Sequence, residues 1–187
     1  MRAAGVECTG HSAGEKGRLA GTLIPLNSVK RFLAPSDFTE ADTWRLVEWC
    51  RSIGANEFTI DCLAADTQTE PPVWAAFARS LEPFRRSADT RERMSGPTAD
   101  DLVRQTPLWE LNRQTVGALK AALPRGLFGY DPAENGWFED PIFYRGGHLI
   151  LGVLSHEAFG VLRLSEAEAA RLAAEGFKSH DALPRVG

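Results

Sequence analysis

The sequence has no apolar run long enough to cross a bilayer, which would need about 20 consecutive apolar residues. Its first residues also lack the continuous apolar core of a secretory signal. We therefore expect a cytoplasmic protein with no membrane partner. The cysteines, Cys8, Cys50 and Cys62, include no C-x-x-C pair, so they favour reduced thiols over a disulfide framework.

The common catalytic fingerprints are also absent. The sequence has no glycine-rich loop of the kinds that cradle nucleotide phosphates, no H-E-x-x-H and no G-x-S-x-G. The chain has no excess of positive charge, because it contains 21 Lys plus Arg and 25 Asp plus Glu. This balance disfavours nucleic acid as a partner. An RNA surface would have to use the arginines at Arg79, Arg85, Arg86, Arg91 and Arg93.

The 187 residues include 43% hydrophobic and 25% charged side chains, the proportions of an ordinary globular protein. Glycines interrupt residues 1–18, where large apolar side chains are scarce. We therefore expect a flexible tail at 1–18 and a single domain over 19–187.

Apolar residues at helical spacing, with capping signals before them, predict four helical segments. They cover about residues 39–53, a segment that Pro71 and Pro72 open and that ends at or just before Pro83, residues 98–123 with a kink or break at Pro107, and residues 165–175.

Alternating residues predict a strand near 57–63. A strand, a Gly-Gly turn and a second strand fit residues 142–154, and a third strand fits 159–164, so the C-terminal part predicts a three-stranded meander. Because helices precede strands, we expect an α+β fold. In it, a helical N-terminal half packs on a small, mainly antiparallel sheet of the meander plus the strand near 57–63, followed by the terminal helix.

The loop at 127–141 combines aromatic and acidic side chains with no basic residue. Aromatic residues are enriched where proteins bind one another, so this loop predicts a macromolecule-binding domain of the immunity, antitoxin or adaptor kind, with another protein as partner. The alternative is that the aromatic rings only plug the loop against the core. The candidate binding residues are Tyr130, Trp137, Phe138, Glu139 and Asp140.

The turn Ser155-His156-Glu157 supplies a second candidate site. If the strands of the hairpin pair antiparallel, Glu139 and Asp140 approach Ser155 and His156. Imidazole and carboxylate groups can transfer protons or hold a divalent metal. The alternative function is therefore a small metal-assisted or acid-base hydrolase acting on a small molecule, with His156 and Glu157 as catalytic residues. From the sequence we expect no cofactor, with a divalent metal as the alternative. The sequence leaves open whether the protein is an enzyme.

Overall fold

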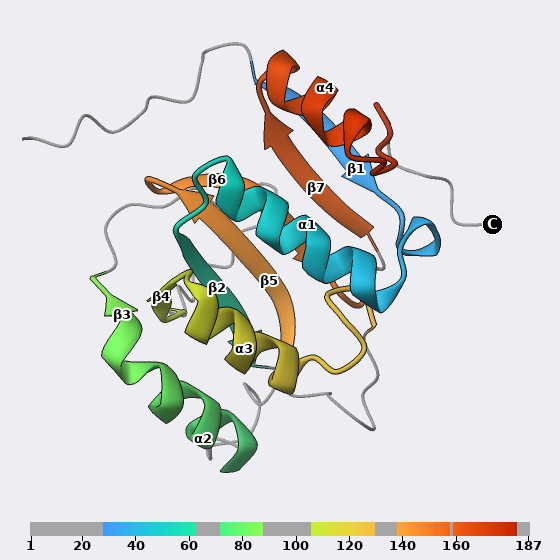
Figure 1. Ribbon diagram of the computed structural model, residues 1–187. Helices are drawn as coiled ribbons and strands as arrows, with labels where there is room; N and C mark the ends of the chain where they lie inside the picture. The colour runs from blue at the N-terminus through green and yellow to red at the C-terminus, as the bar shows by residue number, and fades with distance from the viewer. Residues whose placement is uncertain (1–27, 63–71, 88–105, 130–137, 158, 183–187) are drawn as a thin grey trace, which may run out of the picture.

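The computed structural model describes residues 28–62, 72–87, 106–129, 138–157 and 159–182, and these form an α+β fold (Figure 1). Seven strands make one antiparallel sheet in the order β1-β7-β6-β5-β2-β4-β3. The strands are β1 (Val29–Leu33), β2 (Glu57–Cys62), β3 (Arg85–Arg86), β4 (Leu108–Glu110), β5 (Phe138–Arg145), β6 (His148–Leu154) and β7 (Phe159–Leu164). The tail predicted at 1–18 lies outside the described residues.

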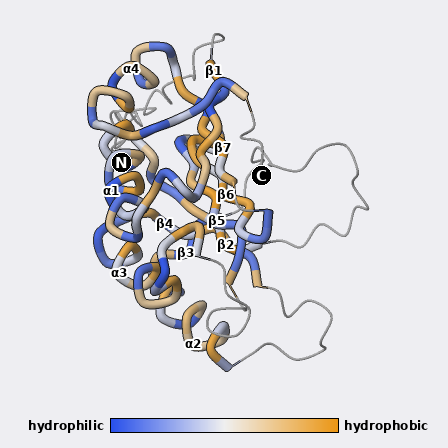
Figure 2. Tube along the Cα trace, turned by 90° about the vertical axis from the view of Figure 1, so that its right-hand side faces the viewer, coloured by the Kyte–Doolittle hydropathy of each residue, from blue (hydrophilic) through white to orange (hydrophobic). Residues whose placement is uncertain are grey.

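The helices are α1 (Glu40–Ser52), α2 (Pro72–Leu81), α3 (Arg113–Ala122) and α4 (Glu166–Ala174). Short 3-10 turns, η1 (Pro35–Asp37) and η3 (Glu82–Phe84), precede α1 and follow α2. The four helices lie on one side of the sheet (Figure 2). No helix in the described part of the chain is both long and apolar enough to span a membrane.

The capping signals predicted for α1 and α4 are confirmed. Thr39 accepts from the backbone N–H of Asp42 at the start of α1, and Asp42 accepts in return from the N–H of Thr39. Ser165 and Glu168 make the same reciprocal pair at α4. Each box satisfies N–H groups that the first helical turn leaves without partners.

The N-terminal half contributes more strands than the sequence predicts. The expected sheet of four strands is correct for β2, β5, β6 and β7, and β2 does pair with β5 beside the meander. However, β1, β3 and β4 extend this sheet at both ends. β1 and β3 are edge strands that carry charged residues, which hide the apolar alternation used to recognise strands.

The helix expected over 98–123 is wrong in its middle. Trp109, which fits helical spacing in the sequence, lies in β4 and pairs with Phe58 of β2. The described helix, α3, begins only after Asn112. A three-residue strand is too short to show an alternating pattern, so its long-range pairing with β2 overrides the local signal.

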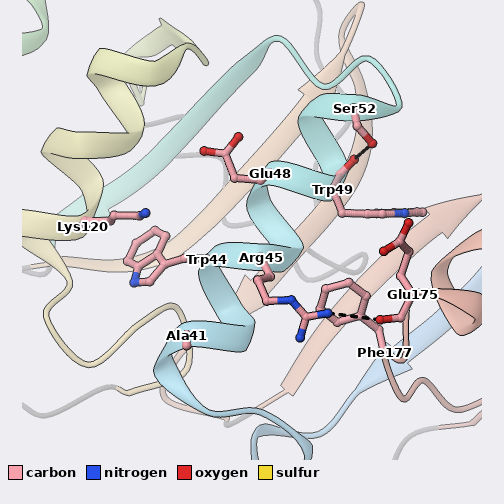
Figure 3. A pocket seen from close by; sticks show the side chains of 9 residues that line it. All are labelled: Ala41, Trp44, Arg45, Glu48, Trp49, Ser52, Lys120, Glu175 and Phe177. Atoms are coloured by element: carbon pink, nitrogen blue, oxygen red, sulfur yellow. Dashed lines mark hydrogen bonds between the residues drawn. The ribbon is translucent and has the colours of Figure 1, made fainter.

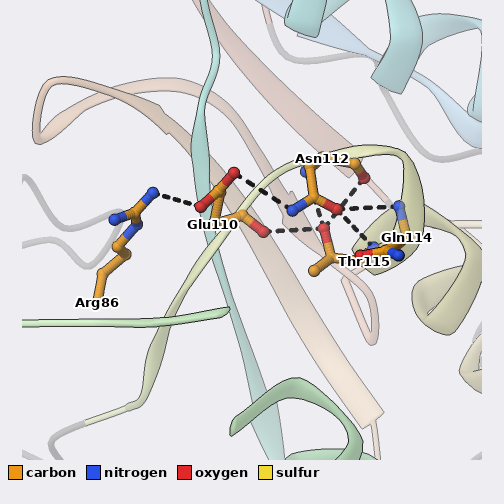
Figure 4. Close-up of polar contacts among 5 residues, drawn as sticks. All are labelled: Arg86, Glu110, Asn112, Gln114 and Thr115. Atoms are coloured by element: carbon orange, nitrogen blue, oxygen red, sulfur yellow. Dashed lines mark hydrogen bonds and ion pairs between the residues drawn. The ribbon is translucent and has the colours of Figure 1, made fainter. Parts of the chain in front are cut away.

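A polar network fixes the start of α3 (Figure 4). Asn112 accepts at Oδ1 from the N–H groups of Gln114 and Thr115, at 2.9 and 3.1 Å. The Thr115 hydroxyl donates to the backbone carbonyl of Glu110 at 2.8 Å, and the Glu110 carboxylate pairs with Arg86 of β3. Asn112 Nδ2 also donates to Oε1 of this carboxylate at 3.3 Å, so the edge strand and the helix cap are joined through Glu110.

The main core lies between the helices and the sheet. It includes Leu46 and Val47 of α1, Leu119 of α3, and Phe58 and Phe143 of the sheet, all 0% exposed. Adjacent strand residues point to opposite faces. Tyr144, next to Phe143, accordingly belongs to a second cluster on the other face, together with Leu108, Leu149 and Ile142.

A largely buried ion pair connects the sheet to two helices. Arg145 at the end of β5 donates to the Glu168 carboxylate of α4 at 2.6 Å and to the Ile53 carbonyl after α1 at 2.7 Å. The Arg145 and Glu168 side chains are only 14% and 15% exposed. Burial opposes ionisation of Glu168, but hydrogen bonds from Arg145 and Ser165 outweigh burial and hold its pKa below the usual value.

Removing Glu168 should destabilise the fold strongly. Glu168→Ala leaves the guanidinium of Arg145 buried without its partner, so the free energy of unfolding should fall by about 3 kcal/mol in urea denaturation. Glu48→Ala is the control, because Glu48 pairs with Arg51 on the more exposed side of α1. That change should cost less than about 1 kcal/mol. Equal losses in the two variants would contradict this role of the Arg145–Glu168 pair.

The same carboxylate should make stability depend on pH. Because the folded pKa of Glu168 lies below its unfolded value, the ionised group stabilises the native state above the unfolded pKa of about 4.3. That contribution is lost as the pH falls through the folded pKa. Unfolding measured between pH 6 and pH 3 should therefore show a smaller acid-induced loss in Glu168→Gln than in the wild type. Parallel curves would contradict this.

Candidate functional site

Three potential metal ligands meet where β5 begins and β6 ends. One ligand atom each of Glu139, Asp140 and His156 lies within 4.8 Å of the others. His156 Nδ1 is 3.5 Å from Glu139 Oε2 and 3.9 Å from Asp140 Oδ1. The convergence predicted from the antiparallel hairpin is therefore confirmed.

This cluster lies on the face of the sheet opposite the helices. Ile60 of β2 belongs to the main core, so its neighbour Asp61 points to the other face. Asp61 pairs with Glu139 of β5, and paired residues share a face. Thr106 donates its hydroxyl to Asp61 at 2.9 Å. A third carboxylate therefore stands beside the cluster.

A bulge in β5 sets the direction of Asp140. Thr59 pairs with Ile142 while Asp61 pairs with Glu139, so β5 has one more residue than β2 between these pairs. Asp140 has a φ of 51°, the one positive φ among the described residues that are not glycine. Aspartate tolerates this left-handed conformation better than most residues, and bulges commonly re-aim side chains beside functional sites.

Two reciprocal hydrogen bonds join Asp140 to the turn after β6. The Asp140 N–H donates to Ser155 Oγ at 3.0 Å, and the Ser155 N–H donates to Asp140 Oδ1 at 2.7 Å. Ser155 is only 6% exposed. The sequence places Ser155 near Asp140 but does not reveal this pair of bonds. The Asp-Pro step inside a strand is the signal that marks the bulge.

The electrostatics of the cluster disfavour two negative charges. Burial raises the pKa of Glu139, and the neighbouring Asp140 and Asp61 raise it further against the opposing effect of His156. Burial also raises the pKa of Asp140, although the Ser155 backbone N–H and His156 counteract it. Among the described residues, no Lys or Arg lies within ion-pair distance of either carboxylate. Arg145, which lies on the same strand, forms its ion pair with Glu168.

The remaining predicted site residues are placed differently. Glu157 is 52% exposed, with Oε1 3.8 Å from His156 Nε2, so the imidazole has a carboxylate near each of its nitrogens. Phe138 is 3% exposed and packs against Trp74 and Phe77 of α2, so its ring belongs to the core and is not presented to a partner. Tyr130 and Trp137 lie outside the described residues.

Two of the arginines considered for RNA contact form ion pairs within the protein. Arg85 pairs with Glu82 at 3.3 Å, and Arg86 pairs with Glu110. Arg91 and Arg93 lie outside the described residues. No observation on the described surface therefore supports an RNA site.

A groove along the solvent side of α1 is a second concave feature, with a volume of about 530 Å³ (Figure 3). Its two basic side chains already have partners within the protein. Arg45 donates to the Glu175 carbonyl at 3.2 Å and lies over the Phe177 ring, and Lys120 lies over the Trp44 ring. The acidic cluster, in which neither Glu139 nor Asp140 has a Lys or Arg partner among the described residues, is the stronger candidate site.

Comparison of the chain with protein-family models, curated proteins and solved structures found no significant match. The functional argument therefore depends on the geometry and electrostatics of the site alone.

Neutralising Glu139 should stabilise the protein in the absence of metal. Because the folded pKa of Glu139 is raised, its ionisation opposes folding as the pH rises through the unfolded and then the folded pKa. Glu139→Gln should raise the free energy of unfolding by about 1 kcal/mol at pH 7.5, and the gain should shrink as the pH falls.

Glu157→Gln is the control for this measurement, because the Glu157 side chain is half exposed and keeps much of its contact with water in the folded protein. It should change the free energy of unfolding by less than about 0.5 kcal/mol. The electrostatic account is contradicted if Glu139→Gln destabilises the protein at pH 7.5 in buffer containing EDTA.

Proposed function

We propose that Glu139, Asp140 and His156 bind a divalent cation and that the site serves metal-assisted hydrolysis of a small molecule. The observation that carries the proposal is the convergence of one imidazole and two carboxylates within 4.8 Å. Two oxygen donors and one nitrogen donor suit Mn²⁺, Fe²⁺ or Zn²⁺. A bound cation would also neutralise the charges that burial makes unfavourable.

The number of protein ligands favours a catalytic over a closed structural metal site. Three protein ligands leave a coordination position for water, whose pKa a zinc ion lowers to about 7. Glu157 near the second imidazole nitrogen can orient the ring, as carboxylates commonly do for histidine ligands. Asp61 stands next to Glu139 in the ladder and adds negative potential that attracts a cation.

The protein-binding function predicted for the loop at 127–141 stays a prediction. Tyr130 and Trp137 lie outside the described residues, and Phe138 is buried against α2. The first residue of the loop is also directed inward, since Leu127 is 1% exposed. These placements give the loop less support than the cation site has.

Thermal melts with a defined metal test the proposal. Adding MnCl₂ or ZnCl₂ to protein stripped with EDTA should raise the melting temperature of the wild type, because a ligand that binds only the native state stabilises it. At a hundred times the dissociation constant the stabilisation is about 2.7 kcal/mol. Glu139→Gln, Asp140→Asn and His156→Ala should each lose most of the shift.

Two control variants separate the cluster from general metal binding by surface groups. His148→Ala removes an exposed histidine from the start of β6, where the cluster has no ligand. Glu166→Gln removes an exposed carboxylate in the first turn of α4. Both should keep the metal-induced shift. A wild type that does not respond, or a response that these controls abolish, would refute the proposed site.

A further inference from the structure

We propose that Ser155 is a positioning residue that holds two of the three cation ligands in register, an inference that rests on the proposed cation site. It touches one ligand directly and is the chain neighbour of another. Its hydroxyl accepts from the Asp140 N–H, its own N–H donates to the Asp140 carboxylate, and His156 follows it in sequence.

The first step of the argument concerns the carboxylate of Asp140. The 2.7 Å bond from the Ser155 N–H fixes the position of Oδ1, the oxygen that lies 3.9 Å from His156 Nδ1. Hydrogen bonds from outside the ligand set orient metal ligands, and their removal typically lowers metal affinity by about 10- to 100-fold.

The second step concerns the backbone beneath that carboxylate. The left-handed conformation of Asp140 is unfavourable for a residue with a side chain, so surrounding contacts must maintain it. The Ser155 hydroxyl supplies the acceptor for the Asp140 N–H at 3.0 Å. Losing this acceptor leaves a partly buried N–H without a partner and weakens the hold on the bulge.

The third step concerns the distance between ligands from different strands. Asp140 belongs to β5, whereas His156 lies in the turn after β6. The two bonds at Ser155 tie these segments together next to the ligand atoms. Ser155 therefore controls the relative position of the carboxylate and the imidazole, in addition to any contribution to folding.

The experiment measures Mn²⁺ affinity of the full chain from the EPR signal of free Mn²⁺, with thermal melts of the metal-free proteins in parallel. Ser155→Ala and Ser155→Cys keep the backbone N–H that donates to Asp140 Oδ1 but remove the hydroxyl that accepts from the Asp140 N–H. They should weaken Mn²⁺ binding by about 10-fold, because the bulge that aims the Asp140 carboxylate then loses a strong acceptor. The cysteine variant fills slightly more space than serine, which keeps the test valid if the cavity in the alanine variant prevents folding, and its thiol is a poor ligand for Mn²⁺. Ser155→Thr, which keeps the hydroxyl, should retain affinity within about threefold of the wild type.

Ser52→Ala is the matched control, since it removes a serine hydroxyl that bonds the Trp49 carbonyl at 2.7 Å on α1. It should leave Mn²⁺ affinity unchanged even if it lowers the melting temperature. Folded Ser155→Cys or Ser155→Ala protein that binds Mn²⁺ as tightly as the wild type would overturn the positioning role alone. A wild type that binds no Mn²⁺ would overturn the cation site itself, and the positioning role with it.

Discussion

The buried pair between Arg145 and Glu168 is the interaction on which the arrangement of the two layers depends. A guanidinium at the end of β5 reaches a carboxylate that also caps α4 and a carbonyl just after α1. Gly54 permits this approach, because a Cβ there would lie 3.1 Å from the Arg145 side chain, and its φ of 101° favours glycine. One charged contact thereby orients two helices against the central strands. Its carboxylate is ionised at neutral pH because hydrogen bonds outweigh the cost of burial.

The opposite end of β5 has the reverse electrostatic character. Glu139 and Asp140 are partly buried beside a third carboxylate, and His156 is the one basic group in ion-pair contact with them among the described residues. The same strand therefore ends in a pair of opposite charges on one side and in an electrostatically unfavourable cluster on the other. Such a cluster opposes folding, and the proposed divalent cation would supply the positive charge that it lacks. A divalent cation would neutralise the carboxylates, and the backbone bulge at Asp140 would direct one of them toward the cation.

The sequence predicts those parts of the molecule that local chemistry determines. Capping boxes locate α1 and α4, and the Gly-Gly turn locates the β5–β6 hairpin, from which the approach of Asp140 to His156 follows. Long-range pairing decides the rest. Trp109 fits a helical pattern but lies in a strand because β2 is available to pair with it, and Phe138 is buried because α2 packs over it. The left-handed Asp140 and its bonds to Ser155 depend on register across two strands, which no local pattern in the sequence displays.

The most direct test of the cation site is a crystal of the full chain grown with MnCl₂, with anomalous scattering recorded for manganese. The account predicts one strong peak at about 2.0–2.3 Å from a carboxylate oxygen of Glu139, a carboxylate oxygen of Asp140 and a nitrogen of His156. It also predicts that the peak is absent from crystals of Asp140→Asn. A manganese peak located elsewhere, or wild-type crystals in which these three side chains hold no metal at saturating MnCl₂, would contradict the account.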